Sequence, residues 1–429
     1  MFKRVGLTLA LLAFVTVACE AEKPGTENET LATVPAAGAT AAPATSAAEM
    51  PAAVTVPVQV DGAAKDFTAA YLAYFPRDVT VHPGDTVKFS LVNTGEPHTV
   101  TFGKDIDDMM ALLQTKTPEQ AADAPEVKKV PVLLPQGPGD AVQSAAQPCF
   151  LATGDPGTDA CAKADRAQVD FNGTQTFYNS GWLTQDKTFE VKFSDSVKPG
   201  KYAYVCLLHM PDMSGTVTVV DKDTPIPSVA DATKQGDTEL QKLTDAIKPA
   251  IDQAQGGQAK PGEVLAGELA QNAMTAEGLM FIPRETTIKA GETVTWNIWG
   301  PHIISFNPPQ DATDLRVVDP EGGVHLNQKL AMPAGGPGQP APPPTEAAPA
   351  GASAAAPAAS GPTPDPNGPP PPPTMIDAGE WDGTGYHSSG IILSFPPALF
   401  AYKLKFTKPG TYLYKCTIHP GMAGSVIVQ

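Results

Sequence analysis

The sequence predicts an all-β fold class, with two β-sandwiches joined by a partly helical linker and interrupted by long insertions. Three observations predict it. Short alternating apolar segments begin near Val54 and recur to Val220, bounded by Pro-Gly and Asn-Thr-Gly turns, and this pattern is typical of strands. A second block of the same kind runs from about Gly278 to Gln429. The two blocks also repeat each other, which indicates a duplicated structural unit.

Each block carries the same two separated modules. The first module is YFPRDVTVHPGDTVKFSLVNTGEPHTVTF from Tyr74 and MFIPRETTIKAGETVTWNIWGPHIISF from Met280. The second is KPGKYAYVCLLHMPDMSGTVTVV from Lys198 and KPGTYLYKCTIHPGMAGSVIVQ from Lys408. Because order and spacing are kept in both halves, we expect two copies of one fold.

The N-terminus has the features of an export signal. Lys3 and Arg4 precede a short apolar run, Val5 to Ala18, and then Cys19, the order that signal-peptide processing requires. The segment resembles a bacterial lipoprotein signal. This implies a lipidated Cys19 and an exported protein in the periplasm or anchored to the outer face of the cytoplasmic membrane, touching the membrane only through the lipid. Residues 20–53 are rich in Thr, Ala, Pro and Glu, and we interpret them as a flexible tether.

The remaining boundaries follow from composition. We expect a first domain at 54–221 with an insertion at 103–185, a linker at 222–261, and a second domain at 262–429 with a Pro-rich disordered insertion at 334–374. Within the first insertion, DIDDMMALLQ predicts an amphipathic helix. Within the linker, Thr238 to Ala254 has helical spacing that Pro249 interrupts, which predicts a kinked helix.

Composition excludes some classes of function. The formal net charge is −17, whereas nucleic-acid binding requires clustered Lys and Arg, so we expect no nucleic-acid partner. The 46 Pro and 38 Gly, many in Ala/Pro tracts, indicate that part of the chain does not pack into a core.

The residues that carry chemistry recur in both halves. Each half has one His in a Pro-His-x-x-x-Phe segment and later a Cys-x-x-His pair followed by Met. Two imidazoles, one thiolate and a thioether are the set that copper uses when it accepts and returns an electron with little rearrangement. These residues are His98, Cys206, His209 and Met213 in the first half, and His302, Cys416, His419 and Met422 in the second.

With these motifs the chain resembles the plastocyanin, pseudoazurin and amicyanin family of blue copper proteins, represented twice. The resemblance implies Greek-key cupredoxin-like sandwiches, each with one type 1 copper held by the four residues named above. The second loop, CTIHPGM, has the spacing of amicyanin. The first, CLLHMPDM, is one residue longer and offers Met210 as an alternative axial ligand to Met213.

Three Cys and three His lie outside the two ligand sets. With Cys19 assigned to the lipid, Cys149 and Cys161 remain as a pair in an oxidising compartment, where a disulfide is expected; the alternative is that they bind a metal. His82 is interpreted as a solvated turn residue, and His325 and His387 as surface residues.

These features predict an electron carrier with an unidentified redox partner protein, and not an enzyme. His209 and His419 are expected to be the exposed edges through which electrons pass, with Pro420, Gly421 and Ala423 forming an apolar docking patch. Copper sequestration or delivery is the main alternative. A copper-dependent oxidoreductase is disfavoured because such enzymes place a His beside the copper Cys, and the sequence has no His-Cys dipeptide.

Overall fold

The computed structural model describes most of the chain after the tether. The signal segment, Cys19, nearly all of the tether and most of the Pro-rich insertion lie outside the described residues. The described ranges are 52–64, 68–91, 97–131, 147–156, 160–163, 167–183, 186–257, 260–270, 273–312, 315–318, 324–335, 372–395, 398–419 and 421–429.

The first half consists of two sheets with a shared core. Along β1 (Thr55–Val60), Val56, Val58 and Val60 are buried and alternate with less buried residues, as a strand with one face on the core requires. One sheet has the order β3 (Tyr74–Phe75), β1, β5 (Thr86–Leu91) and β9 (Lys187–Lys192). The other has the order β4 (Asp78–Val81), β11 (Ser214–Val219), β10 (Gly200–Val205), β6 (Thr101–Phe102), β8 (Phe177–Ser180) and β7 (Pro148–Leu151).

The second half also consists of two sheets. One has the order β2 (Ala69–Tyr71), β13 (Ala273–Ile282), β12 (Glu263–Ala270), β15 (Thr293–Ile298), β24 (Phe400–Phe406) and β21 (Thr374–Trp381). The other has the order β14 (Glu285–Ile288), β26 (Ala423–Val428), β25 (Gly410–Lys415), β17 (Ser305–Phe306), β22 (His387–Ser389) and β20 (Pro333–Ala334). Two short ribbons are formed by β16 (Gly300–His302) with β23 (Ile392–Ser394), and by β18 (Arg316–Val318) with β19 (Val324–Leu326).

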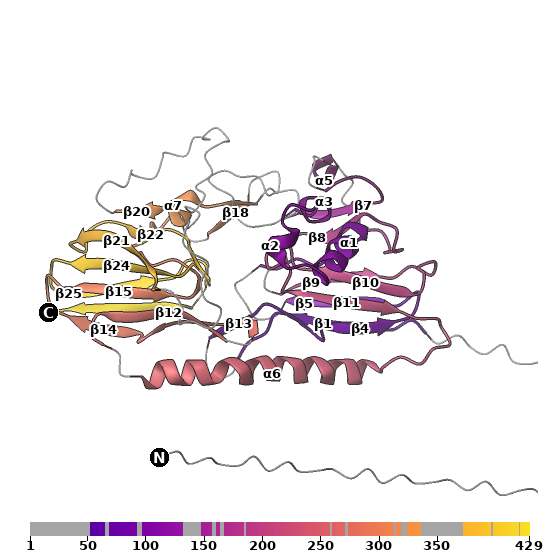
Figure 1. Ribbon diagram of the computed structural model, residues 1–429, viewed down its shortest axis with the longest axis horizontal. Helices are drawn as coiled ribbons and strands as arrows, with labels where there is room; N and C mark the ends of the chain where they lie inside the picture. The colour runs from indigo at the N-terminus through magenta and orange to yellow at the C-terminus, as the bar shows by residue number, and fades with distance from the viewer. Residues whose placement is uncertain are drawn as a thin grey trace, which may run out of the picture. The chain divides into compact units, whose positions relative to one another are not determined.

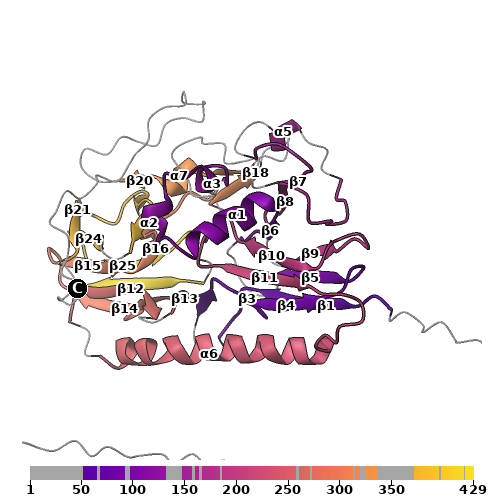
Figure 2. The same cartoon turned by 45° about the vertical axis from the view of Figure 1, so that its right-hand side comes forward.

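The central strands of the two halves are paired in the same way. β1 runs parallel to β5 and β12 parallel to β15; β4 runs parallel to β11 and β14 parallel to β26. The hairpin of β10 and β11 corresponds to that of β25 and β26. The predicted all-β class with two Greek-key sandwiches is therefore confirmed (Figures 1 and 2).

The first insertion contributes more to the fold than its sequence suggested. The predicted helix is present as α1 (Lys104–Leu113), but β7 and β8 also lie in this segment and extend the sheet beyond β6. The insertion has its own core around Ile106, Met109 and Phe177. The remaining short helices are α2 (Pro118–Ala121), α3 (Pro125–Lys128), α5 (Ala160–Lys163) and, in the second half, α7 (Gln328–Ala331).

The two halves share a seam. β2 comes from the first half, yet it pairs with β13 of the second, with Tyr71 opposite Ala276. The linker helix α6 (Val229–Gly256) begins at the cap residue Ser228, continues through Pro249 and packs Ile247 and Ile251 against both strands. None of the helices in the described part of the chain is long and apolar enough to cross a bilayer.

Candidate metal centres

Three predicted ligands of the first half meet at one point. His98 is bridged to Leu183 just before β6, Cys206 follows β10, and His209 lies in the loop that leads to β11. Nδ1 of His98 lies 3.2 Å from Nδ1 of His209, and Cys206 Sγ lies 3.8 Å from the first and 3.6 Å from the second. Two imidazole nitrogens and one sulfur thus converge although 108 residues separate Cys206 from His98.

The second half repeats this geometry. His302 ends β16, Cys416 follows β25, and His419 precedes β26. The two Nδ1 atoms are 3.1 Å apart, and Cys416 Sγ lies 3.9 Å from His302 Nδ1 and 3.6 Å from His419 Nδ1. Within the described residues, these two groups are the clusters of His, Cys, Asp and Glu in which all donor atoms lie within 4.8 Å of one another.

Backbone hydrogen bonds close each ligand loop. The Cys206 N–H donates to the Met213 carbonyl at 2.9 Å, and the Cys416 N–H donates to the Met422 carbonyl at 2.9 Å. Both Met side chains are buried in the same core clusters as the corresponding Cys. Met210 packs instead against the insertion core around Ile106, so the geometry favours Met213 over Met210 as the thioether beside the first cluster.

Each Cys sulfur also accepts a backbone hydrogen bond. The Thr99 N–H lies 3.4 Å from Cys206 Sγ, and the Ile303 N–H lies 3.4 Å from Cys416 Sγ; each donor follows the upstream His directly. Burial opposes the charged thiolates, but the neighbouring His209 and His98, and likewise His419 and His302, lower the pKa of Cys206 and Cys416 well below the usual value. This shift favours the thiolate, which is the form of cysteine that binds metals.

The two centres differ in the group that forms a hydrogen bond with the upstream His. Nε2 of His98 lies 3.2 Å from the buried carboxylate of Asp61, whereas the corresponding hydrogen bond of His302 goes to the backbone of Trp299. Burial opposes protonation of His98, but its hydrogen bonds to Asp61 and Cys206 raise its pKa to about 10. For His302, burial dominates and lowers the pKa. Asp61 was not identified from the sequence because it precedes the modules in which the repeat is visible.

The donor set fits a thiophilic metal that also accepts imidazole. Cys and His together suit copper and zinc, and a trigonal His₂Cys group with a weak axial thioether is typical of blue copper. His98, Cys206, His302 and Cys416 are at most 3 % exposed, and only His209 of the two clusters is partly exposed, so most of each cluster is shielded from water.

Three expectations about other His residues are corrected by the structure. His419 is fully buried rather than an exposed edge, while His209 is partly exposed. His387 is also buried, and its Nε2 lies 2.8 Å from the Tyr402 hydroxyl. His82 is only partly exposed, because its side chain, 15 % exposed, lies beside Asp85 and the Thr224 carbonyl. These positions acquire their burial from distant segments. The side chain of His325 and residue Pro420 lie outside the described part, and Gly421 of the expected patch is exposed.

The structure joins Cys149 to Cys161 by a disulfide between β7 and α5. The two sulfur atoms are bonded to each other, so the expected disulfide is present and these Cys are not free to bind a metal.

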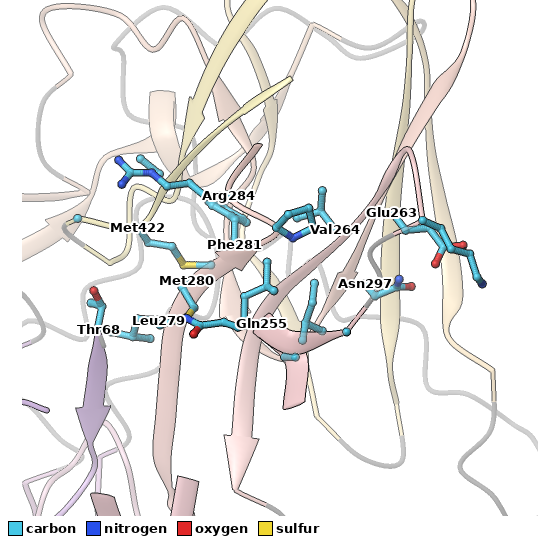
Figure 3. Close-up of a pocket in the computed structure, with 18 residues that line it drawn as sticks. Thr68, Gln255, Glu263, Val264, Leu279, Met280, Phe281, Arg284, Asn297 and Met422 are labelled. Carbon is cyan, nitrogen blue, oxygen red and sulfur yellow. The ribbon is translucent and has the colours of Figure 1, made fainter. Parts of the chain in front are cut away.

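A cavity of about 620 Å³ lies beside the second centre. Gly421, Met422 and Ala423 of the ligand loop line one part of it, and residues of β12, β13 and the end of α6, together with Thr68 and Asn297, line other parts (Figure 3). His302, Cys416 and His419 are not among the lining residues, whereas the expected axial ligand Met422 is.

The fold and the two clusters define a duplicated β-sandwich protein with two His-Cys-His groups whose donor atoms could hold a metal ion. No family model and no curated protein matches the chain. Among solved structures, it is similar to dithionite-reduced auracyanin from the photosynthetic bacterium Roseiflexus castenholzii, at 21 % identity over 40 % of this chain and 99 % of that one, with a TM-score of 0.21. Auracyanin A from Chloroflexus aurantiacus, described as a blue copper protein, shows 18 % identity over 39 % of this chain and all of that one, with a TM-score of 0.22. A copper(I) form of an amicyanin variant shows 14 % identity over 39 % and 82 %, with a TM-score of 0.18.

Proposed function

We propose that the protein is a type 1 copper electron carrier that holds one copper ion in each half. The observation that carries the proposal is the duplicated, largely buried cluster of two imidazole nitrogens and one cysteine sulfur, each with a buried Met in the same loop. Copper cycles between Cu(II) and Cu(I) when bound to such donors. By this proposal His98, Cys206, His209 and Met213 hold one ion, and His302, Cys416, His419 and Met422 hold the other.

Hydrogen bonds from the surrounding backbone hold the proposed ligands in position. Hydrogen bonds from Thr99 and Ile303 fix the two sulfurs, and the loop bonds to Met213 and Met422 fix the spacing of the downstream ligands. Because these groups belong to packed sheets, the ligands keep one arrangement in both oxidation states, which favours rapid electron exchange. This rigidity and burial support an electron carrier over copper sequestration or delivery, since delivery requires an ion that leaves easily.

We further propose, from the sequence alone, that the protein is exported, that the lipid on Cys19 anchors it to the membrane, and that it exchanges electrons with another protein rather than turning over a substrate. His209 is the ligand that supports such exchange in the first half, because it is partly exposed.

Copper titration of the purified protein tests the proposal. We expect two equivalents of Cu(II) to bind with intense blue thiolate-to-copper absorption, and Cys206→Ala and Cys416→Ala each to remove one equivalent and its share of the colour. Replacement of both Cys149 and Cys161 by Ala is the matched control and retains both equivalents, since their sulfurs form a disulfide. Colourless, readily exchanged copper would support delivery instead, and binding of Zn²⁺ in preference to copper would overturn the proposal.

A further inference from the structure

The position occupied by Asp61 in the first half is occupied by Gly267 in the second. In the first half Val60 pairs with Leu91 at the end of β5, and in the second Ala266 pairs with Ile298 at the end of β15. The next residue in each half has a left-handed backbone, with φ of 59° at Asp61 and 79° at Gly267. The two positions therefore correspond in register and both have a left-handed φ, but they carry different side chains.

Asp61 is built into the first centre. It is fully buried, and its Oδ1 accepts hydrogen bonds from the N–H groups of Gly62 at 2.5 Å and Tyr71 at 2.6 Å. Its Oδ2 lies 3.2 Å from Nε2 of His98. A buried carboxylate is tolerated only when such partners compensate for lost hydration, and here they also orient it toward the ligand.

The second centre has no room for a counterpart. A β-carbon at Gly267 would lie 2.1 Å from His302 Nε2 and 2.2 Å from the Trp299 carbonyl oxygen. His302 bonds to the backbone of Trp299, so a neutral dipole takes the place of the carboxylate. At this position the first upstream imidazole thus bonds to a carboxylate and the second to a backbone group.

We propose that Asp61 makes the two centres unequal: it stabilises the oxidised ion of the first centre, so that a single electron given to the protein resides on the second. This inference rests on the proposed function. A carboxylate bonded to the outer nitrogen of a ligating His increases the donation of that ligand and the negative charge near the metal, and both effects favour Cu(II) over Cu(I). One electron from an external reductant converts Cu(II) to Cu(I) at the second centre, and no bond or proton is transferred.

Reduction potentials of single-site proteins test this inference. Cys416→Ala leaves only the first centre and Cys206→Ala only the second. We expect the first centre to have the lower potential. In the Cys416→Ala background, Asp61→Asn should then increase the preference for Cu(I) about tenfold, equivalent to about 59 mV for a one-electron couple. Asn keeps the side-chain size, tolerates the left-handed backbone and removes the charge.

Asp85→Asn is the matched control. Asp85 is also a buried carboxylate of the first half. It accepts hydrogen bonds from the N–H groups of Val54 and His82, and neither residue is a proposed copper ligand. It should leave the potential of the first centre unchanged. Equal potentials in the two single-site proteins, or a higher potential at the first centre, would overturn the inference even if Asp61→Asn fails to fold. Failure of the copper proposal is distinguishable, because those proteins would then show no blue copper at all.

Discussion

Gly267 lies against His302 so closely that its hydrogen atom is the only substituent that fits. A β-carbon there would fall 2.1 Å from His302 Nε2, a distance that real β-carbons do not reach. The glycine is therefore required twice, once by its positive φ of 79° and once by its contact with a ligand. We expect Gly267→Ala to displace His302 and to abolish copper binding in the second half, while the first half still binds one equivalent.

Gly291→Ala separates the two requirements. Gly291 also has a positive φ, at 90°, but no atom lies within 4 Å of a β-carbon built there. This variant should lose only about 1–2 kcal/mol of stability through backbone strain and should keep both copper ions. The same copper loss in both variants would show that strain, rather than contact with His302, is the cause.

The disulfide should stabilise the first insertion locally. Cys149 and Cys161 are 12 residues apart, and closing such a loop contributes about 3 kcal/mol in the chain-entropy model. Replacement of both by Ala should therefore increase hydrogen exchange in β7 and α5, with both copper ions retained. Loss of the first copper ion in this variant would show that the insertion core controls the centre.

Asp107 should make stability depend on pH. Burial raises its pKa to about 6, although the hydrogen bond from the Ala203 N–H, at 2.7 Å, opposes the shift. Between the unfolded value near 4 and the folded value, the folded state binds the proton and the unfolded state does not, so this group favours folding at low pH and loses that effect as pH rises through 6. The loss is on the order of 2–3 kcal/mol at most.

Thermal unfolding of Asp107→Asn between pH 4 and 7 measures this effect by difference from the unmodified protein. Asn can still accept the Ala203 hydrogen bond but does not titrate. We expect the free energy of unfolding of the variant, relative to that of the unmodified protein, to increase as the pH rises across this window. A gap that is independent of pH would contradict the assignment.

The packing of α6 on the seam should be a large contribution to stability. Ile247 is fully buried against β2 and β13, and truncating such a side chain typically costs 2–5 kcal/mol, so we expect Ile247→Ala to cost about that much. Lys248 is the adjacent control, since it is exposed and forms a surface ion pair with Asp252. Lys248→Ala should cost about 1 kcal/mol or less. Chemical denaturation monitored by circular dichroism compares the two.

The sequence was sufficient to predict the two sandwiches and the residues of both clusters. The reason is that Cys206, His209 and Met213 lie within eight residues of one another, and a strand followed by a short loop places them together by local geometry. The upstream His98 could be added because His302 lies in the same Pro-His-x-x-x-Phe segment of the second repeat, and this identified the His that the two repeats share.

Features that depend on distant contacts could not be predicted in this way. Asp61 reaches His98 from a strand end outside the aligned modules, and β2 is a three-residue segment, Ala-Ala-Tyr, too short to show a strand period. The burial of His419 and His387 comes from segments far away in the chain. Local spacing identified the donor atoms, but their environment is set by tertiary packing.

β2 of the first repeat completes a sheet of the second, so the second repeat does not contain every strand of its own sheet. If the second repeat were released by proteolysis within the linker, β13 would lose the strand that pairs with it at Ala276 to Gly278, and its hydrogen-bonding groups would face solvent. Exposed strand edges recruit other chains. We therefore expect the liberated fragment to self-associate more readily than the continuous polypeptide, in which β2 covers this edge.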